Sequence, residues 1–261
     1  GNGNHTITAG SRLDLFRISK TGAGQISLES ATPGVPTTLN LGSTAGGGLS
    51  LPSGVEFNIG NNNVSVIESG TINASGETGV LASNNGKLSL TSSSSSSSYL
   101  YFKPGAATLH TLTQQLTGSG KLYAGNQFRI SDGLKIRAGY LYSQGNVVLL
   151  STSEKTANLQ EIEGNGKVVG DMVVQRYFNN KPRVYRYISG SVKNLKVADW
   201  QQWFPITGTF GNASTGPGLS NQPSLFIREP EGWVAYPSSA QTNQAPIVPC
   251  RGYTAFVRNN S

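Results

Sequence analysis

Short apolar runs separated by glycine, asparagine and serine are the feature that most constrains the first 165 residues. Examples are Leu49-Ser50-Leu51, Val64-Ser65-Val66 and Leu88-Ser89-Leu90. A strand of three residues cannot bury a core alone, but a stack of such strands forms a continuous apolar column. Glycine and asparagine supply the positive-φ corners at which each coil changes direction. The pattern therefore predicts a parallel β-helix, or solenoid, over residues 1–165.

The repeat supports this interpretation without excluding another. The two Leu-Ser-Leu segments start 39 residues apart, which two coils of about 20 residues would produce. An antiparallel sandwich or barrel is the alternative, because its short strands also recur every 8–12 residues or so. The serine run 92–98 is expected to be a strand or loop inside this region, since strand signals resume at Tyr99.

The composition changes after residues 163–166, which predicts a second module over residues 166–261. All three tryptophans lie in it, and its ten Lys and Arg residues outnumber four Asp and Glu residues. We expect an aromatic-rich β-sandwich there, so the whole chain is predicted to be all-β. The basic balance suits anionic glycans or nucleic acid. No basic helix or cationic run accompanies it, so a nucleic-acid partner is not expected.

The order of motifs in the second module resembles a known family. A strand ends in Arg176-Tyr177, and Tyr185-Arg186-Tyr187-Ile188-Ser189 follows. Next comes the Trp-x-x-aromatic patch at Trp200, and the last strand contains Gly252-Tyr253. This order resembles a module in very large surface proteins of Bacteroidota that the type IX secretion system exports.

The resemblance implies a secreted protein on the cell exterior that serves adhesion, gliding or substrate contact, and it implies no activity. The expected partners are the remainder of a larger polypeptide and the secretion machinery. No C-terminal sorting domain is visible and the chain begins at Gly1. We therefore expect a piece of a longer protein, either an internal segment or one whose sorting domain lies beyond Ser261.

Catalytic and metal-binding patterns are weak. Glycoside hydrolases need two carboxylates across a groove, but Glu154, Glu161 and Glu163 cluster beside the module boundary with no aromatic platform nearby. His5 and His110, the only histidines, lack metal-ligand spacing. The lone cysteine, Cys250, cannot form an internal disulfide. We therefore expect no catalytic residue, metal or cofactor.

Aromatic residues of the second module are the candidate glycan contacts, because exposed rings stack on sugars through their apolar faces. The candidates are Trp200, Trp203, Trp233 and Tyr236, with Arg183 and Arg186 meeting anionic groups. Burial of these rings in a small β core is the alternative.

Three functional hypotheses follow. The first is a non-catalytic structural and adhesive segment of a surface protein. The second is a glycan-binding module, and the third is a β-helical enzyme acting on polysaccharide. Membrane insertion is not expected, because the longest apolar stretch, residues 147–150, is far shorter than the ~20 residues that span a bilayer.

Overall fold

The computed structural model describes residues 2–76, 78–93, 95–160, 162–178 and 184–257. The chain forms two compact units, residues 1–177 and 178–261. The all-β fold class is confirmed: the first unit is a parallel β-solenoid, and the second is built on an antiparallel sheet. No helix in the described residues is long and apolar enough to cross a membrane.

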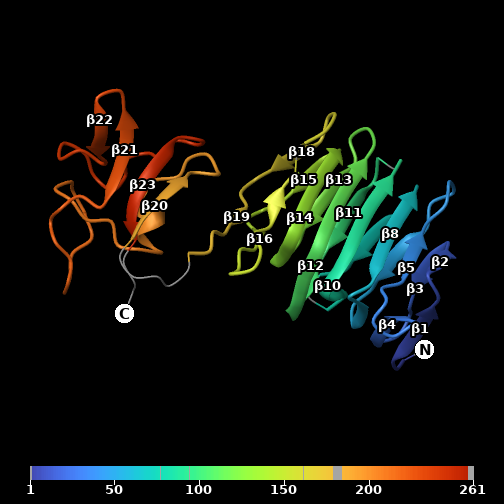
Figure 1. Cartoon of the computed structure of the whole chain (residues 1–261). Helices are drawn as coiled ribbons and strands as arrows, with labels where there is room; N and C mark the ends of the chain where they lie inside the picture. Colours follow the sequence, from blue (N-terminus) through green and yellow to red (C-terminus); the bar gives the residue numbers. More distant parts are fainter. Residues whose placement is uncertain (1, 77, 94, 161, 179–183, 258–261) are drawn as a thin grey trace. The chain divides into compact units, whose positions relative to one another are not determined.

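The solenoid has three columns of parallel strands (Figure 1). The first column holds β1 (His5–Ala9), β4 (Gly24–Ser30), β7 (Val55–Gly60), β16 (Val147–Leu149) and β19 (Val173–Val174). The second holds β2 (Arg12–Leu15), β5 (Thr38–Leu41), β8 (Asn63–Glu68) and β17 (Asn158–Leu159). Three long strands pass through both columns: β10 (Val80–Ser92), β12 (Phe102–Leu116) and β14 (Phe128–Ala138).

The third column forms a separate sheet of seven described strands. They are β3 (Arg17–Ser19), β6 (Gly48–Leu51), β9 (Thr71–Ala74), β11 (Ser97–Leu100), β13 (Lys121–Ala124), β15 (Tyr140–Tyr142) and β18 (Lys167–Val169). The serine run contributes the end of β10 and the start of β11, so its expected place inside this region is confirmed.

The register corrects the expected repeat. Leu88-Ser89-Leu90 of β10 pairs with Val64-Ser65-Val66 of β8, one coil away. Leu49-Ser50-Leu51 lies in β6 of the third column, so the two identical triplets are not equivalent positions. The inference of two 20-residue coils from their spacing was therefore wrong, although the parallel stack it supported is present.

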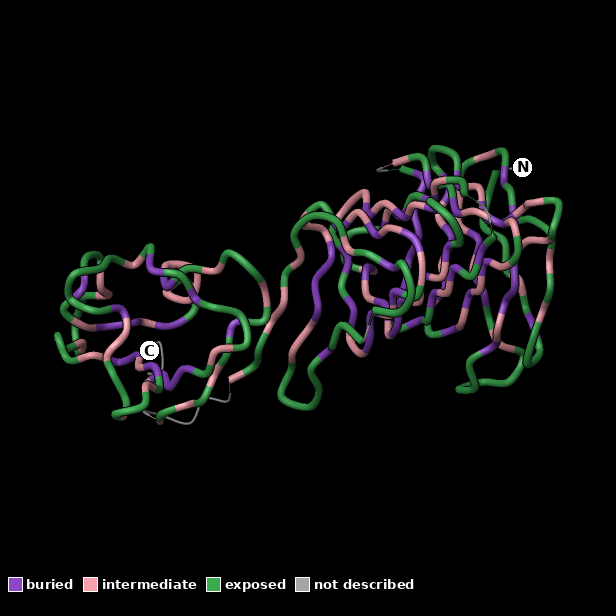
Figure 2. Tube along the Cα trace, turned by 90° about the horizontal axis from the view of Figure 1, so that it is seen from above, coloured by how far each residue is buried: buried purple, intermediate pink, exposed green. Residues whose placement is uncertain are grey.

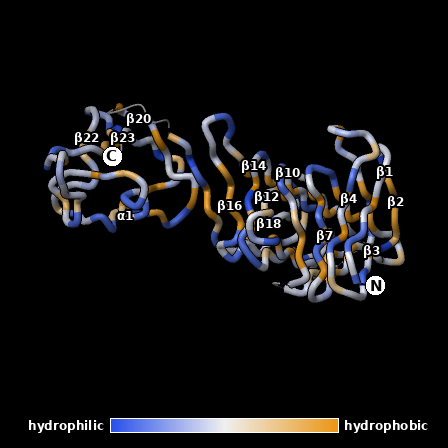
Figure 3. The backbone as a smooth tube through the Cα atoms, turned by 90° about the horizontal axis from the view of Figure 1, so that it is seen from below, coloured by the Kyte–Doolittle hydropathy of each residue, from blue (hydrophilic) through white to orange (hydrophobic). Residues whose placement is uncertain are grey.

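Strand alternation places the core inside the coils. In the second column Leu39, Val64 and Leu88 point inward and are almost fully buried. Figure 2 shows buried residues recurring along each coil, and Figure 3 shows the same segments as hydrophobic. Burial of each such side chain stabilises the fold by roughly 1.5–3 kcal/mol before entropy is counted. The column thus supplies the apolar contact that a single short strand lacks.

Asparagine side chains stabilise some of the corners by hydrogen bonding to backbone groups. Asn62 is buried, and its Oδ1 accepts a hydrogen bond from Thr37 N at 3.1 Å. Its Nδ2 donates to Leu28 O at 2.7 Å. Asn126 similarly accepts from Phe102 N and donates to Phe102 O, both at 2.7 Å. These amides satisfy backbone groups that the turning chain would otherwise leave unpaired.

The solenoid continues beyond the boundary expected at residue 165. β18 pairs with β15, and β19 pairs with β16, both in parallel. The compact units divide between Tyr177 and Phe178. The change in composition at residues 163–166 therefore lies inside the last coil, because Val168 and Val174 still pack on the solenoid core.

The second unit contains one described four-stranded antiparallel sheet, where the sequence predicted a two-sheet sandwich. Its order is β20 (Val184–Ser189), β23 (Gly252–Val257), β21 (Leu225–Glu229) and β22 (Gly232–Ala235). The inner face buries Leu225 and Tyr253 against Val197 of α1 (Val197–Gln201) and against loop residues Phe204 and Ile206. A short helix and loops thus take the place of a second sheet.

Candidate functional site

The structure separates the aromatic residues predicted to bind glycans. Trp200 and Tyr236 pack against the core of the second unit, each with its ring beside Tyr253. The Tyr236 hydroxyl donates to Pro246 O, and burial raises the pKa of this phenol above its usual value. Trp203 follows α1 with 71% of its surface exposed, and Trp233 lies on β22 with 45% exposed.

Of the two predicted arginines, Arg186 lies on the sheet face opposite the one that carries Trp233. It also lies on the face opposite Tyr185 and Tyr187, because successive residues of a strand point to opposite faces. Its guanidinium carbon lies 5.6 Å from the centre of the Phe178 ring. Arg183 lies outside the described residues. Of the predicted set, Trp233 is the one placed on the outward face of the sheet.

That outward face forms an aromatic patch, here called the sheet patch. It consists of Tyr185, Tyr187, Phe226, Trp233 and Phe256. The Tyr187 and Trp233 ring centres are 5.8 Å apart, and those of Tyr185 and Phe256 are 5.0 Å apart. Tyr187 is 79% exposed. Rings left in solvent on one face are unusual in a protein that does not use them for contact.

A second aromatic feature lies on the solenoid, and sequence reasoning missed it. Tyr99, Tyr123 and Tyr142 occupy successive rungs of the third column and point outward. Their ring centres are 4.9 and 4.7 Å apart, with interplanar angles of 10° and 14°. This tyrosine column was not detectable by a fixed period, because the separations are 24 and 19 residues.

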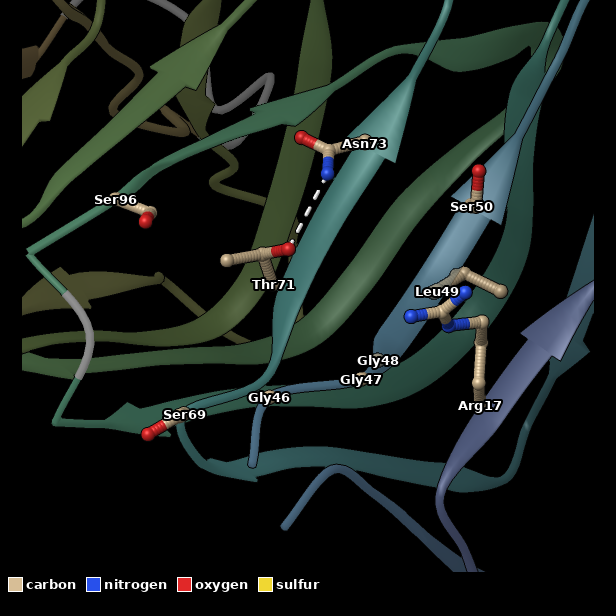
Figure 4. A pocket seen from close by; sticks show the side chains of 10 residues that line it. All are labelled: Arg17, Gly46, Gly47, Gly48, Leu49, Ser50, Ser69, Thr71, Asn73 and Ser96. Atoms are coloured by element: carbon tan, nitrogen blue, oxygen red, sulfur yellow. Dashed lines mark hydrogen bonds between the residues drawn. The ribbon is translucent and has the colours of Figure 1, made fainter. Parts of the chain in front are cut away.

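A polar groove lies on the same sheet, toward its N-terminal end (Figure 4). It encloses about 390 Å³. Its lining residues are Arg17, Gly46, Gly47, Gly48, Leu49, Ser50, Ser69, Thr71, Asn73 and Ser96. Asn73 Nδ2 donates to Thr71 Oγ1 at 3.2 Å. The groove therefore presents a guanidinium, an amide and several hydroxyls on a rigid parallel sheet.

Three consecutive glycines, Gly46, Gly47 and Gly48, line the groove. Gly48 pairs with Arg17 on one side and Thr71 on the other, so one outward position of this row has no side chain. Gly46, Gly47 and Gly48 all have positive φ, between 97° and 105°. Figure 4 shows the Arg17 side chain reaching from β3 toward Gly48. A larger residue at position 48 would clash with the backbone of Thr71 on the next rung.

His110 is the centre of a polar cluster that the sequence did not suggest. Its Nδ1 lies 2.9 Å from Thr111 Oγ1 and 3.5 Å from Asp132 Oδ2, and Lys155 pairs with Asp132. A hydrolytic triad needs the hydroxyl and the carboxylate at opposite ring nitrogens. Here both lie at Nδ1, so the cluster lacks the arrangement of a hydrolytic triad. Burial lowers the pKa of His110, and the Lys155 hydrogen bond lowers that of Asp132.

The two described glutamates that the sequence offered as catalytic groups, Glu154 and Glu163, are both exposed. Glu163 lies 3.6 Å from Arg137 in an exposed ion pair. Glu154 is exposed in the loop after β16, and Glu161 lies outside the described residues. Within the described ranges, no group of three or more His, Cys, Asp and Glu residues could hold a metal ion.

Comparisons with protein-family models, curated proteins and solved structures found no match to this chain. The features that bear on function are therefore the solenoid itself, the sheet patch, the tyrosine column and the groove.

Proposed function

We propose that this chain is a non-catalytic structural and adhesive segment of a large secreted bacterial surface protein. The observation that supports this most directly is the unbroken parallel pairing of the second column, from β2 through β5, β8, β10, β12 and β14 to β17. Each inner coil is hydrogen-bonded to both neighbours, which makes a solenoid stiff along its axis without disulfides. Such a unit suits spacing and presentation of other modules.

The assignment to Bacteroidota and to type IX secretion depends on the motif order over residues 166–261. Tyr185–Ser189 forms β20 and Gly252-Tyr253 begins β23. The two strands pair directly, with Ile188 opposite Tyr253. Two of the resembling motifs are thus neighbouring strands of one sheet, which supports the proposed assignment. The other two lie elsewhere: Trp200 is in α1, and Arg176-Tyr177 ends the first unit.

Surface labelling of the source organism tests this proposal. An antibody against the purified chain is expected to label intact cells, and external protease is expected to remove the signal. Deletion of the type IX machinery should trap the protein inside the cell envelope. A protein that protease reaches only after lysis would contradict the surface role, and unchanged export in the deletion strain would contradict the route.

Glycan binding by the sheet patch is a second candidate function, favoured by the exposure of Tyr187 and Trp233 on one face. Trp233→Ala is expected to weaken binding to a responding glycan on an array by about tenfold, since stacking on an aromatic ring is worth about 1 kcal/mol beyond area burial. Titration calorimetry of the wild type and of Trp233→Ala measures this change in glycan affinity.

Trp203→Ala is the matched control, because Trp203 is also an exposed tryptophan of the second unit but lies after α1, off the sheet. Equal losses of glycan affinity in Trp233→Ala and Trp203→Ala would show that the sheet patch is not the binding site. A wild-type chain that binds no glycan on the array would count against this second function and leave the structural role unaffected.

A further inference from the structure

The groove and the tyrosine column meet on the third column of the solenoid. In the outward row, Ser50 pairs with Asn73, and Asn73 pairs with Tyr99. Short polar side chains therefore give way to a large ring at β11, and Tyr99 lies one rung beyond Asn73, which is a lining residue of the groove. This juxtaposition follows from the coil register and is separate from the sheet patch.

Tyr99 stacks on another tyrosine of the column through one ring face and remains partly exposed. The stacking partner is Tyr123, with a centroid distance of 4.9 Å and an interplanar angle of 10°. Because β9, β11 and β13 are successive rungs, the face opposite Tyr123 is directed toward β9 and the groove. The residue is 39% exposed. Stacking on Tyr123 holds the ring in place, so Tyr99 forms a pre-oriented apolar wall.

The polar lining complements this wall. Thr71, Asn73 and Ser50 supply hydroxyl and amide groups on adjacent rungs. Arg17 is the charged residue of the lining, and no carboxylate belongs to it. Across the described part of the chain, Arg17 forms no ion pair with an acidic side chain, and its guanidinium lies 5.3 Å from the Phe16 ring centre. The groove thus has a net positive character.

We propose that the groove binds an acidic sugar residue of a polysaccharide, such as a hexuronic acid. A pyranose ring has an apolar face of C–H groups that would stack on Tyr99. Its hydroxyls would hydrogen-bond with Thr71 and Asn73, and its carboxylate would pair with Arg17. The volume of about 390 Å³ lies within the range of small-ligand sites, about 300–1,000 Å³. This site does not depend on the cellular location proposed above.

Titration calorimetry with a short linear oligomer of galacturonic acid tests the site on the full chain. We expect saturable binding that Tyr99→Ala weakens by about tenfold. Arg17→Gln should weaken binding of the acidic oligomer by a similar factor, because a charge-assisted pair is lost. Neutral xylan oligomers should bind the wild type more weakly and should be insensitive to Arg17→Gln.

Tyr142→Ala is the matched control. It also removes a terminal ring of the tyrosine column, since Tyr142 stacks on Tyr123 at 4.7 Å, but at the end away from the groove. The Tyr142→Ala variant should bind the acidic oligomer with the same constant as the wild type. Circular dichroism should confirm that all variants fold. Equal weakening by Tyr99→Ala and Tyr142→Ala overturns the proposal. So does failure of the wild type to bind the acidic oligomer, or a neutral oligomer that binds as tightly.

Discussion

Phe102→Ala is expected to lower the free energy of unfolding by roughly 3–5 kcal/mol, the usual cost of emptying a phenylalanine site in a core. Phe102 has no exposed surface and lies at the start of β12. Its ring centre is 5.0 Å from that of Phe128 in the next coil. The cavity cannot collapse readily, because main-chain pairing with Leu81 fixes the spacing of the rungs.

Urea denaturation, monitored by far-ultraviolet circular dichroism, measures the decrease in the free energy of unfolding for Phe102→Ala. Tryptophan fluorescence reports on the second unit separately, since all three tryptophans lie there. Phe16→Ala is the control, because Phe16 is 49% exposed, and its replacement should cost less than about 1 kcal/mol. Similar losses in the two variants would show that the apolar column is not what stabilises the solenoid.

Gly48→Ala is expected to lower the free energy of unfolding by roughly 2–4 kcal/mol, because it adds backbone strain to a steric clash. Gly48 has a φ of 105°, which side chains of L-residues rarely tolerate. A Cβ there would lie 2.1 Å from Thr71 O and 2.7 Å from Thr71 N. Both are backbone atoms in a paired strand, so neither can move aside without breaking the ladder between β6 and β9.

Gly10→Ala is the control for Gly48→Ala in the same denaturation experiment. A Cβ at Gly10 would meet no atom within 4 Å, and its φ lies outside the positive range. We expect a change within about 0.5 kcal/mol for this variant. If Gly48→Ala changed the free energy of unfolding as little as Gly10→Ala does, the turn at position 48 would accept a side chain. The groove would then not require glycine there.

The sequence by itself determined the local features of this protein. Alternation in segments such as Val64-Ser65-Val66 indicates which side chains are buried, because successive residues of a strand point to opposite faces. Glycine and asparagine between these segments mark corners, because they accept backbone conformations that other residues avoid. The parallel solenoid and the shared face of Tyr185 and Tyr187 were therefore predictable from neighbouring residues.

Tertiary structure alone decided which rungs are neighbours. Paired residues lie 31 apart for Ile18 and Leu49 but 19 apart for Leu122 and Leu141, because corner loops differ in length. The alternation of buried and exposed residues along a strand carries no information about how far apart in the sequence two paired residues lie. The tyrosine column and the approach of Tyr99 to Asn73 therefore follow from the register alone. In the second unit, packing of α1 on the sheet decided that Trp200 is partly buried, whereas Trp233 is exposed on β22.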